Sequence, residues 1–92
     1  MKTNVKIENM TSSNGNDIPN QFIIRTDEGT YFQSYKSVIS FKGNDRKILL
    51  DADKWDYSVT TGKYRNIFLG EDKKQTEAKI KSGVYTLVNL NN

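Results

Sequence analysis

The chain has 92 residues with 35% hydrophobic content, and it contains neither cysteine nor histidine. The lack of cysteine excludes disulfides and thiolate sites, and the lack of histidine removes the usual general base and the commonest neutral metal ligand. The net charge is +3, and the whole excess lies in residues 46–92, which hold nine basic and six acidic side chains. This asymmetry favours an anionic partner, although most charge clusters of this size are solvated faces.

The length predicts a single domain with a small core. We expect residues 1–20 to form a polar N-terminal arm and residues 21–92 to form one α+β domain. Within the arm, Val5 and Ile7 alternate with charged residues, which is the pattern of one weak strand. No apolar run follows Met1, so the sequence indicates neither a signal peptide nor a membrane span, and we expect a cytoplasmic protein.

An antiparallel meander of three strands is predicted between Gln21 and Ala52. The first strand is "QFIIRT", and "DEG" forms a hairpin loop after it. The second is the long alternating run "TYFQSYKSVISFK", in which Tyr31, Tyr35, Ile39 and Phe41 share one face and Phe32 and Lys36 lie on the opposite, more exposed face. After the turn "GND", the run "RKILLDA" supplies the third strand.

One or two helices are predicted between Thr60 and Ser82, because the apolar period changes. In "SVTTGKYRNIFLG", the residues Tyr64, Ile67 and Phe68 form a helical stripe. Ser58 or Thr60 can cap the start of this helix, and Gly70 stands where a left-handed residue ends one.

The second helix lies in "EDKKQTEAKIKSG", where Asp72 and Gln75 form a capping box and Gly83 stops the helix. Its low apolar content predicts a surface position. A last strand is expected from Val84 to Leu90, and it is apolar on both faces. We therefore expect a homodimer.

The sequence offers little for catalysis. Asp51, Asp53 and Asp56 make the densest acidic patch, but a calcium loop needs glycine at its sixth position, where Asp56 stands. A magnesium site at two of these residues remains an alternative. A structural role is the better explanation of the patch, because acidic residues before a helix start interact favourably with the positive end of the helix dipole. "TTGKYR" lacks the glycine spacing of a P-loop. We interpret the chain as a non-enzyme without cofactor or metal.

Nucleic-acid binding is the stronger hypothesis. Aromatic residues interleaved with cations on a small sheet are typical of single-strand binders, in which bases stack and phosphates are paired. Trp55 and Tyr64 are expected to be mostly buried. Lys63 and Arg65, at a helix start, are the favoured phosphate contacts. The candidate binding residues are Phe32, Lys36, Tyr57, Thr60, Thr61, Lys63 and Arg65.

The segments "FQSYKSVISF", "LDADKWDYSVTTGKYRNIFLGE" and "KIKSGVYTLVNLN" resemble a group of small uncharacterised proteins of bacteriophages and other mobile elements. The resemblance covers roughly Gln21 to Asn91, and the block from Trp55 to Arg65 is its most specific part. It implies a mobile-element setting and carries no established activity. The strand-then-helix order also resembles the single-strand-binding transcriptional coactivators and Whirly proteins, at the level of fold only.

The mobile-element setting implies an alternative function. Phages carry many short proteins that block host defence, including anti-CRISPR inhibitors. In this alternative, a basic face would bind a host defence protein or an effector complex. Acidic mimicry of DNA is disfavoured, because the net charge has the wrong sign.

Overall fold

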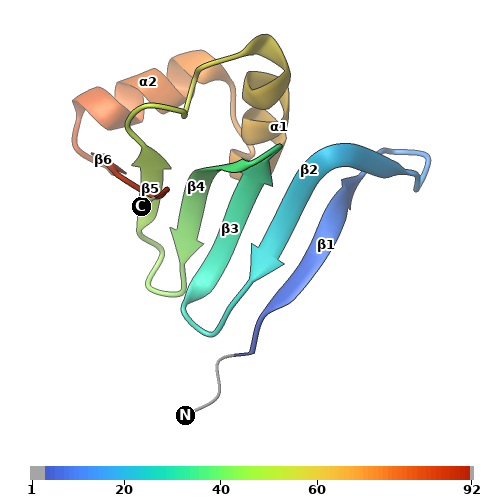
Figure 1. Cartoon of the computed structure of the whole chain (residues 1–92). Helices are drawn as coiled ribbons and strands as arrows, with labels where there is room; N and C mark the ends of the chain where they lie inside the picture. Colours follow the sequence, from blue (N-terminus) through green and yellow to red (C-terminus); the bar gives the residue numbers. More distant parts are fainter. Residues whose placement is uncertain (1–3, 92) are drawn as a thin grey trace.

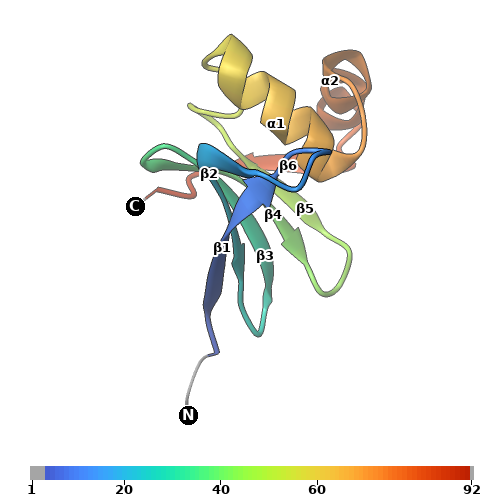
Figure 2. The same ribbon diagram turned by 90° about the vertical axis from the view of Figure 1, so that its right-hand side faces the viewer.

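The computed structural model describes residues 4–91, which form one six-stranded sheet with two helices on one of its sides (Figures 1 and 2). The α+β class expected from the sequence is therefore confirmed. The elements are β1 (Lys6–Thr11), β2 (Asp17–Arg25), β3 (Gly29–Ser34), β4 (Ser37–Gly43), β5 (Ile48–Asp51), α1 (Val59–Leu69), α2 (Lys73–Lys81) and β6 (Tyr85–Val88).

The strands lie in the sheet in the same order as in the chain. Neighbours from β1 to β5 pair antiparallel, as a meander requires, whereas β5 and β6 pair parallel. Parallel neighbours need a crossover connection, and α1 and α2 together supply it. The final strand is shorter than the predicted Val84–Leu90.

The predicted single strand over residues 30–42 is wrong, because it is a hairpin. β3 ends at Ser34 and β4 begins at Ser37, and these two residues pair across the turn. Tyr35 takes a left-handed conformation there, with φ 56°. Such turns normally use glycine, asparagine or aspartate. None of these residues occupies the turn, so its sequence resembles a continuous strand.

The N-terminal segment belongs to the same sheet. β1 begins at Lys6, where a weak strand was expected, and it pairs with β2 from Lys6 opposite Arg25 to Thr11 opposite Asp17. Met10 of β1 is buried in the hydrophobic core. Hence β1 contributes to packing as well as to the sheet edge.

The core lies between the sheet and α1. Phe32 and Ile39 are fully buried, and the ring of Phe32 stacks on that of Phe68 with centroids 5.7 Å apart. The expectation that Phe32 faces solvent is wrong, because alternation along β3 points it toward the helix. Ile67, predicted to face the core, is 58% exposed, so only part of the apolar stripe of α1 is buried.

The helix ends follow the predicted chemistry. Ser58 caps α1 by accepting a hydrogen bond from the Thr61 amide at 3.1 Å, and Gly70 closes the helix in the left-handed conformation. The Asp72–Gln75 capping box is present at the start of α2. These local predictions are confirmed because each depends on a few neighbouring residues.

Candidate nucleic-acid interface

The segment that connects β5 to α1, together with the first turns of α1, surrounds a surface hollow of about 660 Å³. Lys73, the first residue of α2, closes the hollow from the other helix. The residues that line it are Asp56, Tyr57, Ser58, Val59, Gly62, Lys63, Arg65, Asn66 and Lys73. Three lysine or arginine side chains thus surround one carboxylate, and the hollow carries a positive charge.

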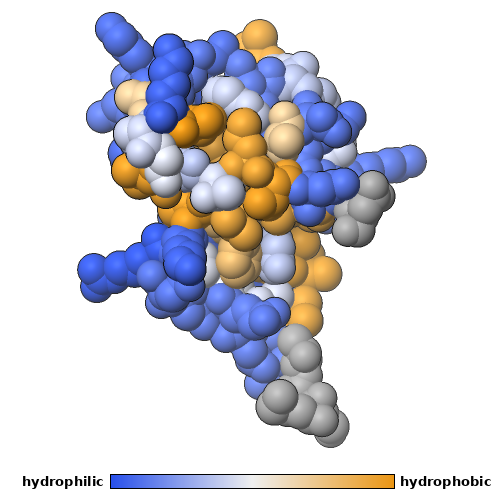
Figure 3. All heavy atoms as spheres, turned by 90° about the vertical axis from the view of Figure 1, so that its left-hand side faces the viewer, coloured by the Kyte–Doolittle hydropathy of each residue, from blue (hydrophilic) through white to orange (hydrophobic). Residues whose placement is uncertain are grey.

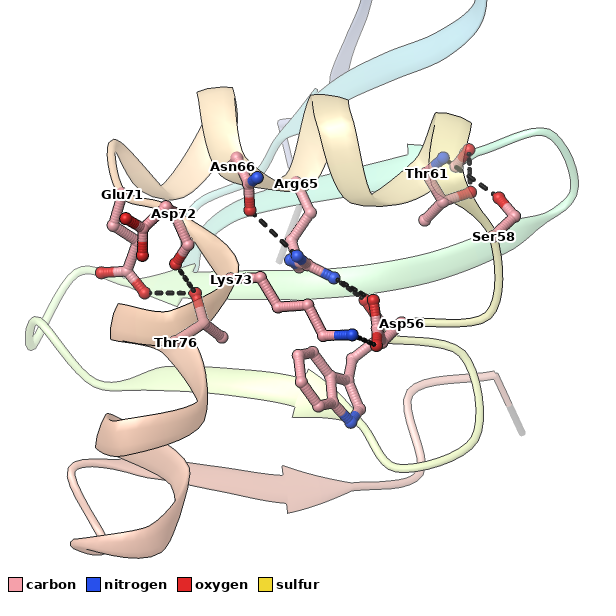
Figure 4. Close-up of polar contacts among 11 residues, drawn as sticks. Asp56, Ser58, Thr61, Arg65, Asn66, Glu71, Asp72, Lys73 and Thr76 are labelled. Carbon is pink, nitrogen blue, oxygen red and sulfur yellow. Dashed lines mark hydrogen bonds and ion pairs between the residues drawn. The ribbon is translucent and has the colours of Figure 1, made fainter.

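Arg65 holds this region together from inside (Figure 4). Its Nη1 donates to the Trp55 carbonyl at 2.6 Å and to Asp56 Oδ1 at 3.1 Å, and its Nη2 donates to Asn66 Oδ1 at 2.9 Å. The side chain is only 1% exposed. The expectation that Arg65 is free to contact phosphate is therefore wrong, since its guanidinium fastens α1 to the preceding loop.

Trp55 covers the arginine. The guanidinium carbon of Arg65 lies 5.1 Å from the centroid of the Trp55 ring, a cation–π distance. Trp55 and Tyr64 are mostly buried, as expected, although part of each side chain reaches solvent. The Nε of Arg65 has no hydrogen-bond partner in the described part of the chain. The Nε–H donor of the buried Arg65 guanidinium, beside the hollow, thus makes no hydrogen bond within residues 4–91.

Asp56 connects the two helices electrostatically. Its Oδ2 pairs with Lys73 Nζ at 2.7 Å while its Oδ1 pairs with Arg65. Burial raises the pKa of Asp56, but the hydrogen bonds and charges of Lys73 and Arg65 outweigh it and leave the pKa below its ordinary value of 3.8. The carboxylate is therefore ionised at neutral pH and partly neutralises the hollow.

A second carboxylate ties α2 to β6. Glu71 accepts hydrogen bonds from Lys79 at 2.6 Å and from the Tyr85 hydroxyl at 2.7 Å. Burial raises the pKa of Glu71, but its hydrogen bonds to Lys79, Thr76 and Tyr85 and the charge of Lys79 outweigh this effect and leave the pKa below its ordinary value of 4.5. Each helix is thus joined to its surroundings through an ionised acid.

These two acids predict acid sensitivity. Because the folded state lowers both pKa values, Asp56 and Glu71 stabilise the fold above their ordinary pKa values, and this stabilisation is lost as the pH falls through the lower folded values. We expect the free energy of unfolding in urea to be level near neutrality and to fall below about pH 4.5. In Asp56→Asn the fall should be shallower, and an unchanged pH profile would contradict the assignment.

Thr61 is also unavailable as a contact residue. It is fully buried, and its hydroxyl lies 2.9 Å from that of Ser34 at the end of β3. The hydrogen bond between Thr61 and Ser34 brings the Tyr35–Lys36 turn beside the start of α1. Thr60 is exposed at the same place, as expected.

Four of the candidate binding residues predicted from the sequence are exposed to solvent: Lys36, Tyr57, Thr60 and Lys63. Tyr57 is 44% exposed, and Lys54 Nζ lies 5.2 Å from its ring centroid. Tyr35, 48% exposed at the hairpin turn, adds a second accessible ring. The expectation that Tyr35 lies on the less exposed face of a continuous strand is wrong, and Lys54 and Lys73 were not predicted from the sequence. The proximity of these residues depends on how α1 meets β3 and α2.

The acidic patch has structural roles. The buried Asp51 accepts backbone hydrogen bonds from Asp53, Lys54 and Leu90, and Asp56 is paired with Arg65 and Lys73. Asp53 is exposed. Residues 4–91 contain no group of three or more acidic side chains that could hold a metal ion.

Comparison with known proteins gives one match. A family model described as "Family of unknown function (DUF8033)" matches residues 5–83. No curated protein and no solved structure matches the chain. Within the described residues, no helix has both the length and the apolar content to cross a membrane.

Proposed function

Since this chain belongs to DUF8033, a family of unknown function, its role has to be argued from its own surface, and we propose that it binds single-stranded nucleic acid without catalysing a reaction. One observation carries this proposal. The surface hollow beside the start of α1 brings two cations, Lys63 and Lys73, together with the exposed ring of Tyr57. A phosphate and a neighbouring base need that combination.

The surroundings extend the same chemistry. Lys54 lies against Tyr57, and the Tyr35–Lys36 turn adds a second ring and cation beside the start of α1. A single strand presents a base and a phosphate at each nucleotide, so alternating rings and cations suit it. Stacking on an aromatic ring contributes about 1–3 kcal/mol per base.

Arg65 serves this surface indirectly. By fixing Trp55, Asp56 and Asn66, it holds the loop that carries Tyr57 in one shape. A preformed loop loses less conformational freedom on binding, which favours affinity. We assign Arg65 a positioning role, and the phosphate contacts to Lys63 and Lys73.

The proposed setting is a bacteriophage or another mobile element, as the sequence resemblance implies. A protein that protects or accompanies single strands suits that setting. An anti-defence inhibitor would use the same basic surface on an acidic host protein. Oligonucleotide binding distinguishes the two functions, because only the first requires it.

Binding should be measured by fluorescence anisotropy with a labelled oligonucleotide of mixed sequence at several salt concentrations. Log affinity should fall with log salt by about 0.7 per phosphate neutralised. Lys63→Ala should weaken binding to all sequences and reduce that slope by about one phosphate. Tyr57→Ala should weaken binding by about 1–3 kcal/mol and leave the slope unchanged, because it removes stacking alone.

Lys47→Ala is the matched control. Lys47 is exposed at the β4–β5 turn, at the end of the sheet opposite the Tyr35–Lys36 turn (Figure 1). It changes the net charge as Lys63→Ala does, so it should weaken binding much less if the hollow is the site. Equal losses in the two variants would show that only overall charge matters. No binding at low salt would end the nucleic-acid proposal and favour the inhibitor.

A further inference from the structure

The sheet has a second face, opposite the helices, and this face is apolar. One row of side chains crosses all six strands on it, since each residue pairs with the next in register. The row consists of Ile7, Ile24, Tyr31, Phe41, Leu49 and Thr86. The rings of Tyr31 and Phe41 lie 4.4 Å apart within it. We call this surface the open face.

Alternation along the strands separates the open face from the core. Phe32 packs on α1, so its neighbour Tyr31 points to the other side. The figures agree, because both helices lie on one side of the sheet in Figure 2. An antiparallel sheet with one solvated face normally alternates apolar and polar residues. Here "FII", "YF" and "LL" place apolar residues on both sides, which is the pattern of strands covered on both faces.

Charge distinguishes the open face from the rest of the molecule. The six residues of its central row are uncharged, and so are those of the next row, Asn9, Phe22, Gln33 and Val38. The charged residues Lys6, Glu8, Arg25 and Lys42 stand in the rows on the helix side. Figure 3, which looks at the β6 edge of the sheet, shows apolar atoms gathered in a band on that side of the molecule, between hydrophilic atoms above and below.

The open face also contains a hollow of about 470 Å³. Tyr31, Phe41, Leu49 and Leu90 provide its apolar wall, and the acidic residues Glu28 and Asp45 also line it. Leu90 is held at this place because its amide donates to Asp51 at 2.8 Å, and because the side chain of the next residue, Asn91, bonds to the backbone of Val38 at 2.7 and 3.0 Å. A hollow in an apolar surface can receive a side chain of a packed partner, as in protein interiors.

We infer that the open face is the interface of a symmetric homodimer, in which two sheets pack face to face. Each chain carries a net charge of +3, and the two central rows of the open face are uncharged, so two copies approach there with little repulsion. A two-fold axis places the central row of one copy against the same row of the other copy. Each open face is thus covered by the apolar surface of its partner. The product is a four-layer assembly of helices, sheet, sheet and helices.

The area of the open face is large enough for a dimer interface. Six strands about 4.8 Å apart and about six residues long give a face of about 500 Å². Two such faces together bury about 1,000 Å², which reaches the lower bound of specific interfaces. The dimer is therefore expected to dissociate reversibly. In each copy, the basic hollow beside α1 lies on the helix side of the sheet, away from the interface. The dimer can therefore bind two nucleic-acid strands, or one long strand at both hollows.

Sedimentation velocity over about 1–100 μM tests the inference. The native chain should approach twice the single-chain mass as its concentration rises. Ile24→Lys places like charges opposite each other across the interface and should raise the dissociation constant at least about tenfold. Ile7→Lys, at a position 64% exposed on the edge strand, should act in the same direction without disturbing the fold. Circular dichroism confirms that each variant folds.

Ile67→Lys is the matched control, because Ile67 is an exposed apolar residue on α1. It adds the same charge on the helix side and should leave the dimer intact. A native chain that stays monomeric at about 100 μM overturns the inference. Dimers of unchanged strength in both Ile24→Lys and Ile7→Lys overturn it as well, since the contact must then lie on another surface.

Discussion

Replacing Phe68 with alanine is expected to lower the free energy of unfolding by about 3–5 kcal/mol. Phe68 is 8% exposed and stacks on the fully buried Phe32, while Lys42 Nζ lies 4.5 Å from its ring centroid. Truncation removes the main apolar contact between α1 and the sheet and leaves a cavity that this small core cannot refill. Urea denaturation followed by circular dichroism measures the loss.

The neighbouring residue supplies the control. Ile67 precedes Phe68 on α1 but is 58% exposed, so Ile67→Ala should change the free energy of unfolding by no more than about 0.5 kcal/mol. The two substitutions differ by one position in the chain and by the face of the helix. Similar effects in both variants would show that α1 is rotated from the orientation described.

Replacing Asp56 with alanine should cost about 3 kcal/mol of stability. The change leaves the guanidinium of Arg65, which is 1% exposed, without its acidic partner, and an uncompensated buried charge is costly. The Trp55 carbonyl and Asn66 still accept hydrogen bonds from Arg65, which keeps the cost at the lower end for broken buried pairs. The thermal midpoint should fall accordingly.

Asp53 provides the matched acid from the same "DADKWD" segment. Its side chain is exposed, so Asp53→Ala should stay within about 0.5 kcal/mol of the native stability. If Asp56→Ala were equally mild, Arg65 would be solvated in solution, and the positioning role assigned to it would be wrong.

The sequence predicted features that depend on near neighbours. Ser58, Gly70 and the Asp72–Gln75 pair act within one helical turn, and each is found as expected. The meander was also predicted, because the "DEG" and "GND" turns divide apolar runs of strand length. The Tyr35–Lys36 turn was not, since a left-handed tyrosine leaves no composition signal.

Features that depend on packing between distant elements could not be predicted. Arg65 looks like a solvated cation in the sequence, and it is buried because Trp55, Asp56 and Asn66 are arranged around it. Phe32 and Tyr31 are adjacent and both aromatic, so the position of α1 decides which of them is core. Lys73 joins the site only because α2 starts beside the loop.

The parallel pairing of β5 with β6 has a consequence for the order in which the chain assembles. The pairs from β1 to β5 close over short turns, so each can form as soon as its two strands are available. β6 pairs only after the segment from residue 52 to residue 84 has closed into a loop, and that segment contains both helices. During synthesis, the edge of β5 therefore stays unpaired until the residues of β6 emerge, and this edge is the place where a nascent chain is open to mispairing.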